Sequence, residues 1–144
     1  MRLGIVVIAL WPYLGLWSVA DEDKATAPPQ ERLVGGWVNI DKDTRGLKRL
    51  AVAKKDDTWS IAAWGSSGGG KGESPWGETG LALLGDSVAS KYLPYGFATW
   101  TPGFAVVHLT LRLEKDELVV ETFMLFKDNS GRSDYRSVYR FRKN

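Results

Sequence analysis

The feature that most constrains the fold is a period-two alternation of apolar and polar residues, which runs from Leu33 to the C-terminus. In 104–113, for example, Val107, Leu109 and Leu111 alternate with His108 and Thr110. Successive side chains of a strand point to opposite faces, so this pattern is typical of a half-buried β-strand. No window after residue 33 keeps the spacing of an amphipathic helix. The sequence therefore predicts an all-β fold.

Turn residues recur every 8–15 positions and divide the region into eight expected strands. Eight short antiparallel strands without a covering helix can hide their edges by closing into an up-and-down barrel, and a sandwich is the alternative. A barrel of this size has room inside for side chains or for one small ligand. The expected strands are Val34–Ile40, Leu47–Lys54, Thr58–Gly65, Glu78–Leu84, Tyr95–Thr101, Phe104–Leu113, Leu118–Lys127 and Asp134–Arg142.

The N-terminal segment is predicted to be a targeting sequence rather than part of the folded domain. Residues 1–20 combine Arg2, an apolar run and the small residues Ser18 and Ala20, which is the pattern of a cleaved signal peptide; an uncleaved anchor is the alternative. Residues 21–32 lack apolar periodicity and contain the pair Pro28-Pro29, which predicts a flexible tether. We expect a secreted or periplasmic protein with one β-barrel domain over residues 33–144.

Composition excludes several kinds of site. The chain has no cysteine and one histidine, so it has no disulfide framework, no thiolate metal site and no His-rich zinc site. Without residues 1–20, which hold one arginine and no acid, 18 basic residues face 17 acidic ones, a net charge of +1. A balance this even argues against nucleic acid as a partner. We expect no cofactor and no resident metal.

Two polar segments resemble ligand loops, and each has a simpler interpretation. The segment 41–46 alternates carboxylates as calcium loops do, but it lacks their final acidic ligand, so we expect a capped turn with Gly46 in a left-handed conformation. The glycine-rich segment 66–72 lacks the Gly-Lys-Ser/Thr end and the following helix of a phosphate loop. It is expected to be a flexible hairpin loop.

A set of motifs spread over most of the domain resembles a small, uncharacterised β-barrel domain of secreted and modular bacterial proteins. That resemblance implies no activity. Family members carry two cysteines between the two Trp-Gly pairs, whereas this chain has serines and glycines there, which predicts a looser loop. The motifs are Trp37-Val38-Asn39-x-Asp41-x-x-Thr44-Arg45-Gly46, Trp64-Gly65, Trp76-Gly77-Glu78, Leu118-Val119-Val120-Glu121-Thr122-Phe123 and Asp128-x-Ser130-Gly131-Arg132-Ser133-x-Tyr135.

The opening Gly35-Gly36-Trp37 is also similar to the Gly-x-Trp of the calycin barrels, the group of lipocalins, fatty-acid-binding proteins and avidins. In that group the tryptophan closes one barrel end, and a basic residue near the last strand packs over it. The resemblance implies a calycin-like barrel in which Arg140 or Arg142 has that role. Gly35, Trp37, Arg45, Gly46 and Arg140 are the residues expected to act structurally.

Aromatic residues give the best indication of function. Trp37 and Trp59 lie inside expected strands with apolar neighbours, which favours core packing. Other aromatics flank turns, where a ring with a polar edge suits a sugar or a small apolar molecule. We therefore expect a non-enzymatic module that binds a small molecule or carbohydrate at the barrel mouth. The expected ligand-binding residues are Trp64, Trp76, Tyr95 and Trp100.

Two further functions stay open. The expected seventh strand is apolar on both faces, and an exposed stripe of Val119, Phe123 and Leu125 would suit a secreted or cell-surface protein partner. A carboxylate pair could support glycoside hydrolysis, although sequence brings no two carboxylates together and His108 is better explained as a polar strand residue. The carboxylates considered are Glu73, Glu78, Glu114, Glu117 and Glu121.

Overall fold

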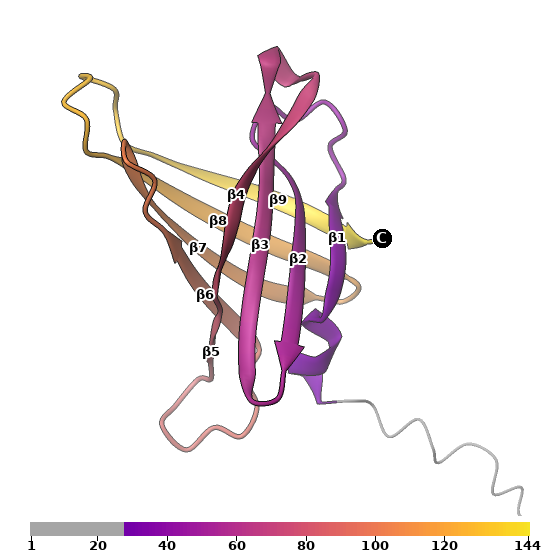
Figure 1. Cartoon of the computed structure of the whole chain (residues 1–144). Coiled ribbons are helices and arrows are strands. Elements are labelled where there is room, and N and C mark those ends of the chain that lie inside the picture. The colour runs from indigo at the N-terminus through magenta and orange to yellow at the C-terminus, as the bar shows by residue number, and fades with distance from the viewer. Residues whose placement is uncertain (1–27) are drawn as a thin grey trace, which may run out of the picture.

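The computed structural model describes residues 28–144 (Figure 1). The expected signal peptide, residues 1–20, and residues 21–27 of the expected tether lie outside the described residues. No helix within the described part of the chain is long and apolar enough to cross a membrane. Residues 29–32, the end of the expected tether, form a short 3₁₀ helix together with Leu33, η1 (Pro29–Leu33).

Nine strands and a second 3₁₀ turn follow, so the all-β prediction is confirmed. The strands are β1 (Gly35–Asn39), β2 (Leu47–Lys55), β3 (Thr58–Ser67), β4 (Gly72–Gly80), β5 (Ala82–Leu84), β6 (Tyr95–Trp100), β7 (Ala105–Glu114), β8 (Glu117–Phe126) and β9 (Tyr135–Lys143). The second 3₁₀ turn is η2 (Gly68–Gly70). The glycine-rich segment 66–72 therefore forms the tip of the β3–β4 hairpin, with residues 68–71 as the turn and Ser66, Ser67 and Gly72 at the strand ends.

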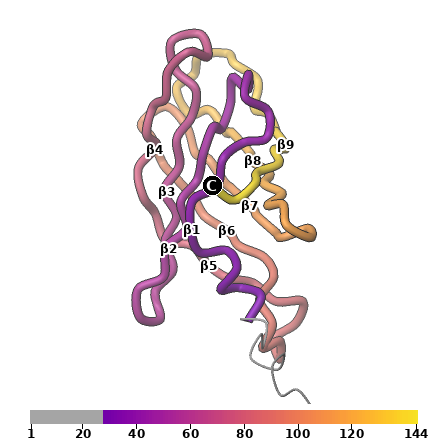
Figure 2. The backbone as a smooth tube through the Cα atoms, turned by 90° about the vertical axis from the view of Figure 1, so that its right-hand side faces the viewer, coloured from indigo at the N-terminus to yellow at the C-terminus, as the bar shows by residue number. Residues whose placement is uncertain are grey.

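All strands belong to one antiparallel sheet with the order β4-β3-β2-β1-β9-β8-β7-β6-β5. The sheet is strongly coiled, so β7, β8 and β9 cross behind β2, β3 and β4 (Figures 1 and 2). The expected fourth strand proves to be two. Its first part, β4, pairs with β3, whereas β5 pairs with β6, and only Leu81 separates them.

Coiling brings β4 next to β6, but these strands share no backbone ladder within the described sheet. Side chains connect them instead. The Thr79 hydroxyl donates to the Thr99 carbonyl at 3.0 Å, and Trp100 Nε1 donates to the Gly77 carbonyl at 3.1 Å. The sheet is thus not closed into the expected eight-stranded barrel, because side-chain hydrogen bonds and not a backbone ladder join β4 to β6.

The core fills the space between the crossing parts of the sheet. Alternation places Leu109 and Leu111 of β7 inward, in one core cluster with buried residues of β1, β2, β3, β6, β8 and β9. Burying large aliphatic and aromatic side chains is the main source of stability for such a sheet. Fully buried members of this core include Leu47, Leu50, Ile61, Leu109, Leu118, Val120 and Phe141.

The η1 helix covers one end of this core. Leu33 is buried there, and its carbonyl accepts a 2.8 Å hydrogen bond from Nε1 of Trp37, a ring with 2% of its surface exposed. The cation over this ring is Lys143, whose Nζ lies 5.2 Å from the ring centroid, and not Arg140 or Arg142 as expected. Period two explains the difference, since residue 143 shares the inward face of Phe141 whereas 140 and 142 point outward.

The turn between β1 and β2 is capped by side chains, as expected. Asp41 Oδ1 accepts the Asp43 amide at 3.0 Å, and Thr44 Oγ1 accepts the Gly46 amide at 3.2 Å. The left-handed conformation expected for Gly46 is wrong, because its φ is not positive. Gly46 instead makes room for Tyr139, whose hydroxyl would lie 2.1 Å from an added Cβ atom. Arg45 is exposed beside the glycine-rich turn.

Ion pairs cover the outer face of β7, β8 and β9. Arg140 pairs with Glu114 at 3.1 Å and with Glu117 at 2.9 Å, while Glu121 pairs with Arg136 at 2.8 Å. Val119, opposite Arg112 and Arg140 in the sheet, is 2% exposed. The apolar stripe expected for a protein partner is therefore interrupted: Val119 is buried, and Leu125 is exposed.

These pairs predict a pH dependence of stability. The hydrogen bond from Arg136 lowers the pKa of Glu121 below its ordinary value of 4.5. A carboxyl with a lowered folded-state pKa stabilises the fold fully above its unfolded-state pKa and loses that effect as pH falls through the folded-state value. We expect Glu121→Gln to lower the urea midpoint at about pH 7 and to change it less at about pH 3. An equal change at both pH values would contradict this assignment.

Candidate functional site

A cavity of about 440 Å³ opens at the end of the sheet that lies away from η1. It lies between the β3–β4 hairpin, the β6–β7 connection and the inner face of β7 and β8. Most of its wall is aromatic or aliphatic, with three hydroxyl side chains at its edge. Its lining residues are Ser66, Ser74, Pro75, Trp76, Trp100, Thr101, Pro102, Phe104, Val107 and Met124.

Two tryptophans from strands that are not neighbours in the sheet form one wall. Trp76 of β4 and Trp100 of β6 meet edge to face, with ring centroids 5.8 Å apart and planes at 77°. The Trp76 ring lies against the backbone at Gly65, where a Cβ atom would approach its Nε1 to 2.5 Å. The Trp100 ring is held by its hydrogen bond to the Gly77 carbonyl. The wall is therefore fixed by packing before any ligand binds.

The opposite wall comes from β7 and β8. Val107 and Met124 are direct cross-strand partners, so their side chains lie together on the inner face. Phe104 precedes β7 at the entrance and has 45% of its surface exposed. A large exposed ring at the rim of an apolar cavity is a feature of ligand entrances rather than of a sealed core.

The structure brings together two of the four expected ligand-binding residues. Trp76 and Trp100 line the cavity, whereas Trp64 and Tyr95 do not. Trp64 lies outside, beneath the Arg49 guanidinium, whose Cζ is 3.7 Å from the ring centroid. Tyr95 is exposed near Asp86, whose negative charge raises the pKa of the tyrosine hydroxyl.

Phe104, Val107 and Met124 were missed as site residues by sequence reasoning. Alternation correctly predicts Val107 on the same face as Leu109, but it cannot distinguish a core position from a cavity wall. Met124 becomes a cavity residue because the β7–β8 register pairs it with Val107 near the open end. That register, together with the positions of the strand ends, is the signal that could have identified both.

No charged side chain of residues 28–144 lines the cavity. The five carboxylates considered for hydrolysis all lie elsewhere: Glu73 pairs with Arg49, and Glu114, Glu117 and Glu121 belong to the outer ion pairs, while Glu78 is exposed on β4. Within residues 28–144, no three His, Cys, Asp or Glu side chains are grouped to hold a metal ion. The cavity therefore offers apolar contact and hydroxyl hydrogen bonds, but no acid and base pair.

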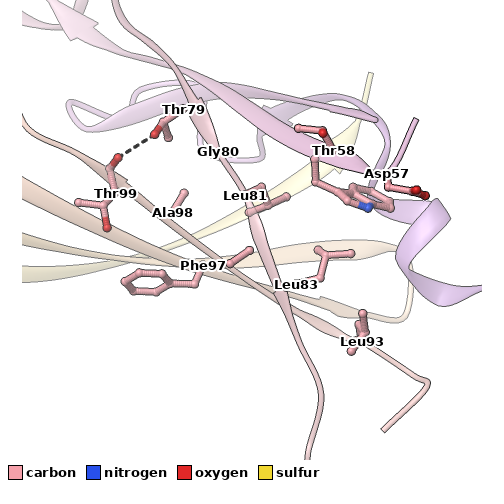
Figure 3. A pocket seen from close by; sticks show the side chains of 12 residues that line it. Asp57, Thr58, Thr79, Gly80, Leu81, Leu83, Leu93, Phe97, Ala98 and Thr99 are labelled. Atoms are coloured by element: carbon pink, nitrogen blue, oxygen red, sulfur yellow. Dashed lines mark hydrogen bonds between the residues drawn. The ribbon is translucent and has the colours of Figure 1, made fainter. Parts of the chain in front are cut away.

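A second hollow lies where β3, β5 and β6 diverge (Figure 3). It measures about 750 Å³ and is a wide groove, more open to solvent than the aromatic cavity. Leu81, Leu83, Leu93 and Phe97 contribute apolar contacts. The Phe97 ring stacks on His108 at 5.7 Å, and the Thr99 hydroxyl lies 2.9 Å from the histidine Nδ1. His108 is thus a hydrogen-bonded strand residue, as its position in the sequence suggested.

Comparisons of the chain with protein-family models, with curated proteins and with solved structures give no match. The chemistry of the molecule is therefore inferred from its own residues. Of the two hollows, the aromatic cavity is the more enclosed, and it holds the fixed tryptophan pair. It is the candidate functional site.

Proposed function

We propose that this protein is a secreted, non-enzymatic module that binds a small molecule with an apolar body in the aromatic cavity. The observation that carries this proposal is the pair of tryptophan rings, nearly perpendicular to each other, in a partly enclosed cavity of about 440 Å³. Small-molecule sites have volumes of roughly 300–1,000 Å³ and apolar walls with few polar groups. Secretion is inferred from residues 1–20 of the sequence.

The lining chemistry defines the part of the ligand that enters. With no charge on the wall, an ionised group inside the cavity would lose its hydration without gaining a partner. Ser66, Ser74 and Thr101 supply hydroxyls that orient a polar substituent. An aromatic or aliphatic body with one or two oxygen atoms fits this set.

We also propose a calycin-like arrangement of the strands. Within residues 72–84, β4 pairs with β3 and β5 pairs with β6. Counted as one bent strand, β4 and β5 would reduce the nine strands to eight around the core. Glu31 of η1 accepts a hydrogen bond from Lys54, so this helix lies near the turn between β2 and β3. The cavity lies at the other end of β3, where Ser66 and Ser74 line it. One covered end and one open end suit a ligand-binding barrel.

The proposal is tested with the uncharged fluorescent probe N-phenyl-1-naphthylamine. We expect the purified protein to bind the probe and to raise its emission, because the cavity removes the probe from water. Met124→Glu places a carboxylate in the cavity wall and is expected to weaken binding at least about tenfold. Probe titrations at constant protein concentration, with circular dichroism as a check on folding, measure the effect.

Leu125→Glu is the matched control, since Leu125 is the next residue of β8 and does not line the cavity. This variant is expected to bind the probe with unchanged affinity. Equal loss in the two variants would place the probe on the outer face of β8 and reject the aromatic cavity as the site. An unmodified protein that does not bind the probe would also count against the proposed function.

A further inference from the structure

We infer that Arg132 recognises an acidic group at the entrance of the aromatic cavity, so that its ligands are small amphipathic organic anions. This inference rests on the proposed function and extends it from the body of the ligand to its charged end. The apolar body enters between Trp76, Trp100 and Met124, and the acidic group stays at the mouth. The following contacts of Arg132 support this assignment.

Aromatic rings hold the Arg132 guanidinium at the cavity entrance. Its Cζ lies 4.0 Å from the ring centroid of Phe126 and 5.6 Å from that of Phe104, the exposed ring that lines the entrance. The Phe126 ring in turn contacts Tyr135, with centroids 6.1 Å apart. A guanidinium stacked on rings keeps its N–H groups directed outward in its own plane, where they can bind an anion.

The segment that carries Arg132, residues 127–134, is ordered by its own hydrogen bonds. Asp128 Oδ1 accepts the Ser130 amide at 3.1 Å, and Asp134 Oδ1 accepts the Phe126 amide at 2.8 Å. Arg132 Nε donates to Ser130 Oγ at 2.8 Å. The arginine is thus held in position before binding, which lowers the entropy cost of ordering it around a ligand.

The guanidinium retains binding capacity. Its Nη2 donates to Asp128 Oδ2, but Nη1 has no acceptor among residues 28–144, and 49% of the side chain is exposed. Because the cavity wall carries no charge, Arg132 is the cation that contacts this entrance through Phe104. A carboxylate or sulfonate beside Phe104 can accept hydrogen bonds from the guanidinium, and charge-assisted bonds of this kind are stronger than neutral ones.

Asp128 competes with such a ligand, because its carboxylate already pairs with the same guanidinium. A variant that removes this charge but keeps the Oδ1 atom that accepts the Ser130 amide therefore provides a second test. Its expected effect on anion binding is opposite to that of removing Arg132. Asp128→Asn preserves an oxygen for the Ser130 amide and frees Arg132 to bind an external anion. Arg132→Gln removes the cation and keeps a polar side chain of moderate length.

The experiment compares two probes that share a phenyl-naphthylamine body, the uncharged N-phenyl-1-naphthylamine and the anionic 8-anilinonaphthalene-1-sulfonate. We expect Arg132→Gln to weaken binding of the sulfonate about three- to tenfold and to leave the uncharged probe within about twofold. We expect Asp128→Asn to strengthen binding of the sulfonate alone. Fluorescence titrations of the unmodified protein and of the two folded variants with each probe, at low and at high salt, give six affinities at each salt concentration.

The possible failures are distinct. If the uncharged probe binds in the cavity but Arg132→Gln changes both probes equally or changes neither, the inference about Arg132 is overturned and the proposed function stands. A weaker sulfonate affinity in Asp128→Asn would likewise reject the competition between Asp128 and the ligand. If neither probe binds the unmodified protein, the proposed function fails and the inference about Arg132 fails with it.

Discussion

Replacing Trp37 by alanine is expected to lower the free energy of unfolding by about 3–5 kcal/mol. The ring is buried beneath η1, donates to the Leu33 carbonyl and lies under Lys143 Nζ. Its removal leaves a cavity at the covered end of the core and an unpaired carbonyl, and both effects destabilise the fold. Urea denaturation followed by far-ultraviolet circular dichroism measures the loss.

Trp64→Ala is the matched control, because it deletes the same side chain from the outer face. There the ring contacts the partly exposed Arg49 instead of the core, so a loss of about 1 kcal/mol is expected. Similar losses for the two variants would show that Trp37 has no special role at the covered end. A larger loss for Trp64 would reverse the assignment of inner and outer faces on β3.

Adding one methyl group at Gly46 is expected to destabilise the protein by about 1–3 kcal/mol. An alanine Cβ there would lie 2.1 Å from the Tyr139 hydroxyl oxygen and 2.8 Å from Cζ of the same ring. Tyr139 packs edge to face on the buried Phe141, with centroids 6.4 Å apart, so the ring cannot move without disturbing the core. The change is read from the urea midpoint of Gly46→Ala.

Gly80→Ala makes the same chemical change where nothing lies within 4 Å of the added Cβ and φ is not positive. It is expected to change the free energy of unfolding by less than about 0.5 kcal/mol. The contrast between the two glycines isolates the contact with Tyr139 from the general effect of alanine on the unfolded chain. Gly46→Ala at wild-type stability would mean that Tyr139 has room to shift.

Local patterns in the sequence predict much of this fold. The alternation in β7 correctly places Leu109 and Leu111 inward and His108 outward, because the two-residue period depends only on the strand backbone. Applied to β9, the same rule would have chosen Lys143 rather than Arg140 as the cation over Trp37. The segment after the glycine-rich turn was harder to interpret, since pairing with β3 makes a strand of Gly72–Gly80 despite its poor intrinsic β-propensity.

The site was only half predictable, because its geometry depends on how far the sheet coils. Trp76 and Trp100 meet although β4 and β6 are not neighbours in the sheet order. Trp64 has the same position beside a turn as Trp76, yet its ring points outward, next to a bulge between Ala63 and Trp64. Arg132 reaches the entrance through a loop whose path no local pattern specifies.

The contact between β4 and β6 would give the proposed ligand a structural role. The Thr79 and Trp100 side chains connect these two strands by hydrogen bonds. If β4 and β6 moved apart, no backbone ladder between them would break, since they share none. Trp76 belongs to β4 and Trp100 to β6, so the ligand we propose would contact both strands across this contact region. On that proposal, ligand binding would be coupled to the contact between β4 and β6, and each would stabilise the other.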